Sequence, residues 1–114
     1  MGLEISERRA NNILVMELSG TLTLGDEAGQ LRARFREILS DGTNQLVLDL
    51  SKLSYVDSMG LGALVAGFTT ARNEGGDVKL AKLSAQFHEQ LAVTKLDTVF
   101  EVYATVEEAV RSFG

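Results

Sequence analysis

The 114-residue sequence contains no cysteine, no proline and no tryptophan, and it has a single histidine. Without cysteine the chain can form neither a disulfide framework nor a cysteine-ligated zinc cluster, and this usage fits a reducing compartment. One histidine and scattered carboxylates make no recognisable set of metal ligands, so no metal site is expected. Because proline is absent, every turn must rely on glycine, asparagine, aspartate or serine.

Long hydrophobic runs are absent too. The longest mostly apolar stretch, Met59 to Thr70, contains three glycines and is shorter than the roughly 20 apolar residues of a membrane-spanning helix. The first nine residues carry two glutamates and two arginines in place of an apolar core, which is unlike a signal peptide. The sequence therefore predicts a cytoplasmic protein that does not insert directly into a membrane.

Positive charge is in short supply. Sixteen acidic residues against 11 basic ones give a net charge of -5, which argues against nucleic acid or an anionic membrane as the main partner. Arg32, Arg34 and Arg36 alternate along a predicted helix, where alternate residues do not share a face, so they are interpreted as solvated surface. The length and the share of hydrophobic residues, 45%, are those of one globular domain over residues 1–114.

Hydrophobic periodicity divides the chain into strands and helices. Short apolar runs predict five strands, and apolar positions three and four residues apart predict four helices. The predicted strands are Leu3–Arg8, Ile13–Leu18, Leu46–Leu50, Val78–Leu83 and Val99–Tyr103. The predicted helices are Gly25–Ser40, Ser58–Asn73, a short helix capped by Ser84 that contains Phe87 and Leu91, and a last helix opened by a capping box at Thr105–Glu108.

The resulting order, ββαβαβαβα, predicts an α/β fold with a mixed, mostly parallel sheet. Strands that alternate with helices imply right-handed crossovers between parallel strands. The first two strands are expected to form a hairpin around Asn11 and Asn12, which makes the sheet mixed. Residues 19–21 are interpreted as a break that ends the second strand, and residues 51–57 as a loop that crosses the top of the sheet.

The junction between the central strand and the second long helix is the most informative segment. Open parallel sheets bind ligands and partners at the carboxyl edge of their strands, and a helix that starts there presents unpaired N–H groups. Asp57 or Ser58 can cap this helix. Gly60, Gly62 and Gly67 each cost roughly 1 kcal/mol in a helix interior. They therefore predict a close approach, either by the chain's own sheet or by another protein.

From the residues alone, several interpretations of Ser58 stay open. It can be a plain helix cap. As a nucleophile beside Asp57 it would need a base, but the only histidine, His88, falls on a predicted surface helix, and the Gly-x-Ser-x-Gly pattern of hydrolases is absent. A nucleotide could sit at the helix N-terminus, but the sequence has no glycine-rich phosphate loop. We therefore expect neither catalysis nor a cofactor.

The nine residues from Val56 to Leu64 read Val-Asp-Ser-Met-Gly-Leu-Gly-Ala-Leu. This pattern resembles the signature of the STAS domain, and more narrowly that of the bacterial anti-sigma factor antagonists. The resemblance extends to Leu18–Leu22, to the strand Leu46–Leu50 and to Thr94–Phe100. It implies a protein that binds an anti-sigma factor, often itself a serine kinase, and so releases a sigma factor, with a phosphatase reversing the phosphorylation.

The same resemblance assigns the site residues. Ser58 is the phosphoacceptor, and Asp57, Met59, Gly60 and Gly62 surround it on the partner-binding surface. A phosphate adds about -1.5 to -2 charge at neutral pH. We expect this charge to eject the partner while leaving the fold largely unchanged, since a helix N-terminus tolerates an anion.

Two positions depart from the family pattern. Met59 stands where many members have a second small hydroxyl residue. Thr23, in the loop before the first long helix, stands where many have an acidic residue, and it joins the expected partner-binding set. Two alternatives stay open. One is a STAS subunit of a stress-signalling or lipid-transport complex that binds a different protein. The other is a homodimer formed through the edge strand Leu3–Arg8 or through the apolar helix face around Met59.

Overall fold

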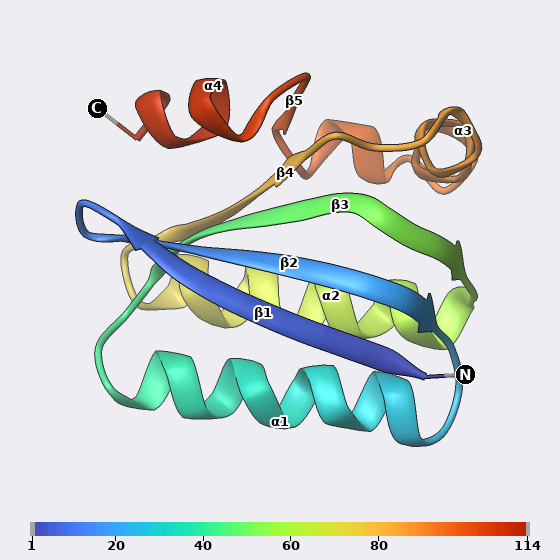
Figure 1. The fold of residues 1–114 in the computed structure, drawn as a ribbon, viewed down its shortest axis with the longest axis horizontal. Helices are drawn as coiled ribbons and strands as arrows, with labels where there is room; N and C mark the ends of the chain where they lie inside the picture. Colours follow the sequence, from blue (N-terminus) through green and yellow to red (C-terminus); the bar gives the residue numbers. More distant parts are fainter. Residues whose placement is uncertain (1, 114) are drawn as a thin grey trace.

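The computed structural model describes residues 2–113, so the predicted domain limits, residues 1 and 114, lie outside the described range. The strands of this part of the chain are β1 (Leu3–Ala10), β2 (Ile13–Leu22), β3 (Gln45–Val56), β4 (Asp77–Ala81) and β5 (Val102–Tyr103). The helices are α1 (Asp26–Ser40), α2 (Ser58–Asn73), α3 (Ala85–Val93) and α4 (Val106–Arg111). This is the predicted order ββαβαβαβα, and the α/β fold class is confirmed (Figure 1).

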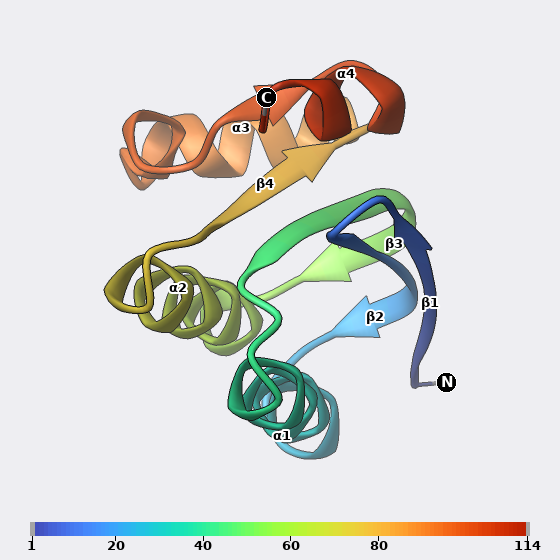
Figure 2. The same ribbon diagram turned by 90° about the vertical axis from the view of Figure 1, so that its left-hand side faces the viewer.

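The strands form one mixed sheet in the order β1-β2-β3-β4-β5. β1 pairs antiparallel with β2 through a tight turn in which Asn11 has a positive φ of 59°. The neighbours β2–β3, β3–β4 and β4–β5 are all parallel, as the alternation with helices predicted. Figure 2 shows α1 and α2 side by side along one face of the sheet, while α4 lies on its other side.

Two hydrophobic cores hold the helices to the sheet. The larger one joins the inner face of the sheet to α1, α2 and α3, and all five apolar positions that predicted α1 are buried in it: Ala28, Leu31, Phe35, Ile38 and Leu39. The smaller core lies under α4, where Val106 and Ala109 pack against residues of β2, β3 and β4. The capping residues are also confirmed, since Ser84 Oγ accepts from the Phe87 N–H and Thr105 Oγ1 accepts from the Glu108 N–H, both at 3.1 Å.

Two sequence predictions about the central strands are wrong. Residues 19–21 do not end β2, and residues 51–56 are not a loop, because both strands run on to Leu22 and Val56, which pair in register. β3 carries one extra residue between Asp49 and Lys52 and another at Ser54. Each such bulge shifts the alternation of buried and exposed side chains by one residue, so the buried residues here are three positions apart. The sequence of this segment therefore lacks the two-residue periodicity from which a strand is predicted.

The C-terminal part of the sheet is shorter than predicted. β4 ends at Ala81 because Lys82 adopts a left-handed conformation with φ of 60°. Leu96–Thr98 form a short 3-10 helix, and the strand predicted from Val99 begins only at Val102. Phe100 is buried instead of paired, and its ring contacts the ring of Phe68 edge-on at 5.0 Å between centroids.

Candidate functional site

The candidate site lies where β2 and β3 end and α2 begins, at the right-hand edge of the molecule in Figure 1. Because Leu22 and Val56 are register partners, the segment that follows β2 and the residue that follows β3 emerge side by side. The two bulges in β3 make this possible, since they let the strand reach the same edge as β2. The correction to the strand lengths therefore brings Thr23, predicted from one loop, to the same edge as Asp57, predicted from the other.

Asp57 is the residue that joins the two segments. Its Oδ1 accepts from the Gly60 N–H at 2.9 Å and caps α2, while its Oδ2 accepts from the Leu24 N–H, also at 2.9 Å. Its own N–H donates to the Leu22 carbonyl oxygen at 3.2 Å. The bond from Gly60, followed by the bond from Leu24, holds the pKa of the Asp57 carboxyl below its usual value. Asp57 is thus ionised at neutral pH and connects the two segments through these bonds, an arrangement called the Asp57 clasp below. It is also the N-cap of α2, a role that the sequence left open between Asp57 and Ser58.

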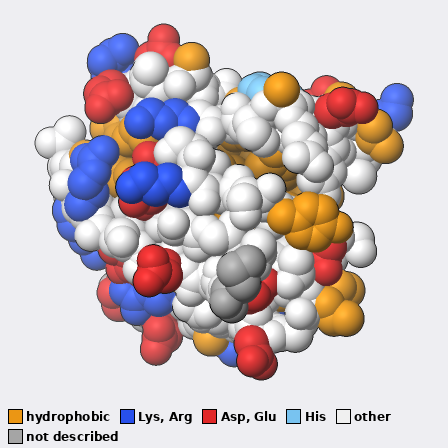
Figure 3. All heavy atoms as spheres, turned by 45° about the vertical axis from the view of Figure 1, so that its right-hand side comes forward, with side chains coloured by type: hydrophobic (Ala, Val, Ile, Leu, Met, Phe, Trp, Pro, Cys, Tyr) orange, Lys and Arg blue, Asp and Glu red, His pale blue; other side chains and the backbone are white. Residues whose placement is uncertain are grey.

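Ser58 is left free by this arrangement. It is the first residue of α2, it is exposed, and within residues 2–113 its side chain has no hydrogen-bond partner. Its neighbours along the chain and across the Asp57 clasp are apolar and exposed: Leu24 keeps 68% of its surface accessible, Tyr55 52% and Met59 46%. Figure 3 shows hydrophobic side chains at the surface of this edge, away from most of the lysines and arginines.

The exposed apolar surface continues toward α3. The Gln90 side chain donates to the Val56 carbonyl oxygen at 2.9 Å and ties α3 to the end of β3. Beside this bond runs a shallow groove, walled by Tyr55 on one side and by Val93, which is 75% exposed, on the other. The groove is also lined by the polar side chains of Gln86, Glu89, Gln90 and Thr94, so the surface from Tyr55 to the outer side of α3 is of mixed character.

The three glycines of α2 have two different explanations. A Cβ at Gly60 would lie 2.8 Å from the carbonyl carbon of Leu22 and still closer to its oxygen, and a Cβ at Gly67 would lie 2.5 Å from the Phe35 ring. The chain's own β2 and α1 therefore require these two glycines. A Cβ at Gly62 would meet only one atom, Nη2 of Arg32 at 3.5 Å, which is an ordinary contact.

Thr23 takes part in a cluster that the sequence analysis did not predict. The hydroxyls of Thr21 and Thr23 and the N–H of Thr23 all donate to one carboxylate oxygen of Glu27, in the first turn of α1. The bonds from Thr23 and then Thr21 hold the pKa of Glu27 below its usual value. Thr23 does not cap α1, whose N-cap is Gly25 without a side-chain cap bond, and the four-residue spacing from Thr23 to Glu27 is not that of a capping box, so no local sequence pattern indicated this cluster.

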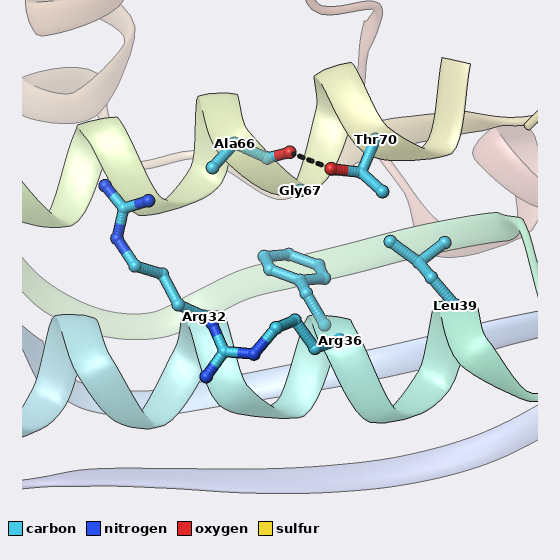
Figure 4. A pocket seen from close by; sticks show the side chains of 7 residues that line it. Arg32, Arg36, Leu39, Ala66, Gly67 and Thr70 are labelled. Atoms are coloured by element: carbon cyan, nitrogen blue, oxygen red, sulfur yellow. Dashed lines mark hydrogen bonds between the residues drawn. The ribbon is translucent and has the colours of Figure 1, made fainter. Parts of the chain in front are cut away.

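A groove lies between α1 and the middle of α2 (Figure 4). It encloses about 220 Å³ and is lined by Arg32, Phe35, Arg36, Leu39, Ala66, Gly67 and Thr70. Arg32 and Arg36, four residues apart on α1, share this face, whereas Arg34 points to β1 and pairs with Glu7. Within residues 2–113 neither Arg32 nor Arg36 forms an ion pair, so of the three arginines interpreted as solvated surface, only Arg34 is held by a partner from another element.

The described residues place neither a base beside Ser58 nor a set of metal ligands. His88 is exposed on α3, and no hydrogen bond within residues 2–113 joins it to Ser58. In the same range, no group of three or more histidine, aspartate or glutamate side chains is placed to bind a metal ion. No helix of this part of the chain is both long and apolar enough to cross a membrane.

Known proteins match this chain along most of its length. The family model of the STAS domain matches residues 4–109. A Thermotoga maritima protein, provisionally named an anti-sigma factor antagonist, is 32% identical over 75 residues, which cover 66% of either chain. The anti-sigma-B factor antagonist of Bacillus subtilis is 26% identical over 111 residues, 97% of this chain and all of that protein.

Solved structures share the fold. A crystal structure of a Thermotoga maritima protein, with the same provisional description, superposes with a TM-score of 0.89 at 24% identity, over 95% of this chain and 92% of that one. The Bacillus cell fate determinant SpoIIAA, solved in its phosphorylated form, superposes with a TM-score of 0.76 at 20% identity, over 97% of this chain and all of that one. SpoIIAA has also been solved unphosphorylated, where it is described as an anti-sigma factor antagonist.

Proposed function

The chain belongs to the STAS domain family, and from this premise we propose that it is an anti-sigma factor antagonist whose docking surface is switched by phosphorylation of Ser58. The unmodified protein binds an anti-sigma factor in the cytoplasm and so frees a sigma factor. A serine kinase, which in this scheme is the anti-sigma factor itself, phosphorylates Ser58 and ends the interaction. A phosphatase restores the binding form.

The observation that carries this proposal is the position of Ser58, whose exposed hydroxyl has no hydrogen-bond partner within residues 2–113 and lies close to exposed apolar side chains. Leu24, Tyr55 and Met59 surround the Asp57 clasp and remain largely accessible. Fully burying a side chain of this size against a partner stabilises a complex by about 1.5–3 kcal/mol. A few such anchors around one serine are what a protein-docking surface with a central switch requires.

Phosphorylation would act on docking more than on folding. The bonds that shape this edge of the molecule are made by Asp57, not by Ser58, so a group added to the Ser58 hydroxyl displaces none of them. A doubly charged phosphate in an apolar contact must lose much of its water without gaining a partner on the docked protein. Such desolvation costs several kcal/mol, and each 1.4 kcal/mol is a factor of ten in affinity.

The chemical step is an ordinary phosphoryl transfer. The Ser58 Oγ forms a bond to the γ-phosphorus of ATP as the bond from that phosphorus to the bridging oxygen breaks and ADP leaves. The hydroxyl proton passes to a base of the kinase. This chain contributes an acceptor that is exposed, stands at the end of a rigid helix and is held in place by the Asp57 clasp beside it. The reverse step is hydrolysis of the same ester by the phosphatase.

The proposal is tested by isolating the partner with matched baits. The baits are the unmodified protein, the Ser58→Asp variant and, as a control, Asn12→Asp. Asn12 is exposed in the β1–β2 turn at the opposite end of the molecule, so this variant adds the same charge far from Ser58. We expect an anti-sigma factor, identified by mass spectrometry, with the unmodified and Asn12→Asp baits and not with Ser58→Asp. Recovery of transport or stress-complex subunits in its place would refute the assignment.

A further inference from the structure

The charges around Ser58 determine how a phosphate on its hydroxyl would be stabilised. A free N-terminus would favour a phosphate through its unpaired N–H groups. In α2 the Asp57 carboxylate already lies at this end of the helix, where its Oδ1 accepts from the Gly60 N–H at 2.9 Å. A phosphate on Ser58 would therefore meet an anionic neighbour, and it needs a positive charge from elsewhere.

Arg32 is the positive charge that the fold places nearby. Figure 4 shows its side chain reaching from α1 across to α2. Its Nη2 lies 3.5 Å from the point where Gly62 would carry a Cβ. Gly62 follows Ser58 by four residues, so the two positions share one face of the helix, with about 5–6 Å between their Cβ positions. The guanidinium therefore lies beside the turn of α2 that follows Ser58.

The missing side chain at Gly62 gives Arg32 its place. Gly60 and Gly67 are required by packing inside the molecule, but Gly62 has no neighbour within 4 Å except this one arginine atom. A long side chain at position 62 would occupy the space over α2 that the guanidinium uses. Arg32 is also uncommitted, because within residues 2–113 it forms no ion pair. The glycine that packing does not explain and the arginine without a partner are thus explained together.

We propose that Arg32 is the internal counter-ion of the phosphate on Ser58, and that the absence of a side chain at Gly62 leaves room for its guanidinium to reach the phosphate. A guanidinium can bind a phosphate through two parallel hydrogen bonds, which makes arginine suited to this role. The pair would link α1 to α2 across the mouth of their groove. The inference rests on the proposed phosphorylation of Ser58, but it concerns only this chain and does not depend on which partner is bound.

The test follows the phosphate itself. Phosphoserine is placed at position 58 during synthesis, and the second ionisation of the phosphate is followed by ³¹P NMR at low ionic strength. The proteins compared are wild type, Arg32→Gln, Gly62→Leu and, as the matched control, Arg36→Gln. Arg36 is also unpaired and lies one turn further along α1. Circular dichroism of each unphosphorylated variant establishes that it is folded.

We expect the phosphate pKa to be higher in Arg32→Gln than in wild type by about half a unit or more, the size expected for a unit charge about 5 Å away in water. Gly62→Leu should raise it similarly, although Arg32 is still present, and Arg36→Gln should change it little. Equal values in wild type and Arg32→Gln, or an equal rise in Arg36→Gln, would overturn the assignment. If phosphorylation left partner binding unchanged, the proposed function would fail while this titration kept its meaning.

Discussion

Adding one methyl group at Gly60 or at Gly62 should change the stability of the protein in opposite directions. Both residues lie in the first turns of α2, and alanine is preferred to glycine in a helix interior by about 1 kcal/mol at either position. They differ in what surrounds the new Cβ. At Gly62 the nearest atom is the mobile end of Arg32, at 3.5 Å, so the helix gain is kept. Gly62→Ala should therefore be more stable than wild type by about 0.5–1 kcal/mol.

At Gly60 the new Cβ meets backbone. It would lie 2.8 Å from the Leu22 carbonyl carbon and closer still to the oxygen, and neither atom can move without moving β2. The start of α2 must shift away, which strains the bond from the Asp57 N–H to the same oxygen. Overpacking of this kind costs about 1–3 kcal/mol. After the helix gain is subtracted, Gly60→Ala should be less stable than wild type by up to about 2 kcal/mol.

Urea unfolding followed by circular dichroism measures this difference directly. Equal m-values would show that both variants unfold from a similar native state. The two variants should therefore be separated by up to about 3 kcal/mol, which corresponds to a difference in melting temperature of up to roughly 20 °C for a chain of this size. If Gly60→Ala were as stable as Gly62→Ala, the close approach of α2 to β2 described here would be refuted.

Three further predictions follow from individual side chains. Folding lowers the pKa of the Asp57 carboxyl, so its ionised form contributes stability that is present above its usual pKa of 3.8 and is lost as the pH falls through the lower pKa of the folded state. The difference in unfolding free energy between wild type and Asp57→Asn, measured in urea, should therefore narrow below about pH 4. Lys79 is buried, with its Nζ 2.8 Å from Ser112 Oγ and 4.3 Å from the centre of the Phe113 ring. Lys79→Ala should lower the unfolding free energy by about 2–3 kcal/mol, whereas Lys79→Met, which keeps most of the side-chain volume, should lower it by clearly less. Leu24→Asn should weaken partner binding by about tenfold or more in calorimetry, while its 68% exposure predicts an unchanged melting temperature.

The sequence predicted the parts of the fold that follow simple periodicity. The buried stripe of α1, the hairpin at Asn11 and the caps at Ser84 and Thr105 could all be predicted, because each depends on residues close together in the chain. The second half of β3 could not, because its bulges change the spacing of buried residues from two to three. That pattern carries no strand signal unless the partner strand is known.

The candidate site divides in the same way. The motif around Ser58 is local, so the helix start could be predicted from the sequence, with the cap limited to Asp57 or Ser58. The second bond of Asp57, to the Leu24 N–H, spans 33 residues and depends on β2 and β3 ending together. The contact between Arg32 and Gly62 likewise depends on the packing of α1 against α2. The spacing of residues in the sequence predicts neither the bond between Asp57 and Leu24 nor the proximity of Arg32 to Gly62.

Phosphorylation of Ser58 as the switch for docking is the central claim, and calorimetry with the isolated anti-sigma factor tests it most directly. The dissociation constant is measured for the unmodified protein and for the protein that carries phosphoserine at position 58, with their circular dichroism spectra compared. The account predicts an affinity at least about 100-fold lower for the phosphorylated form, which corresponds to roughly 2.8 kcal/mol, and spectra that superimpose. Equal dissociation constants for the two forms would contradict it.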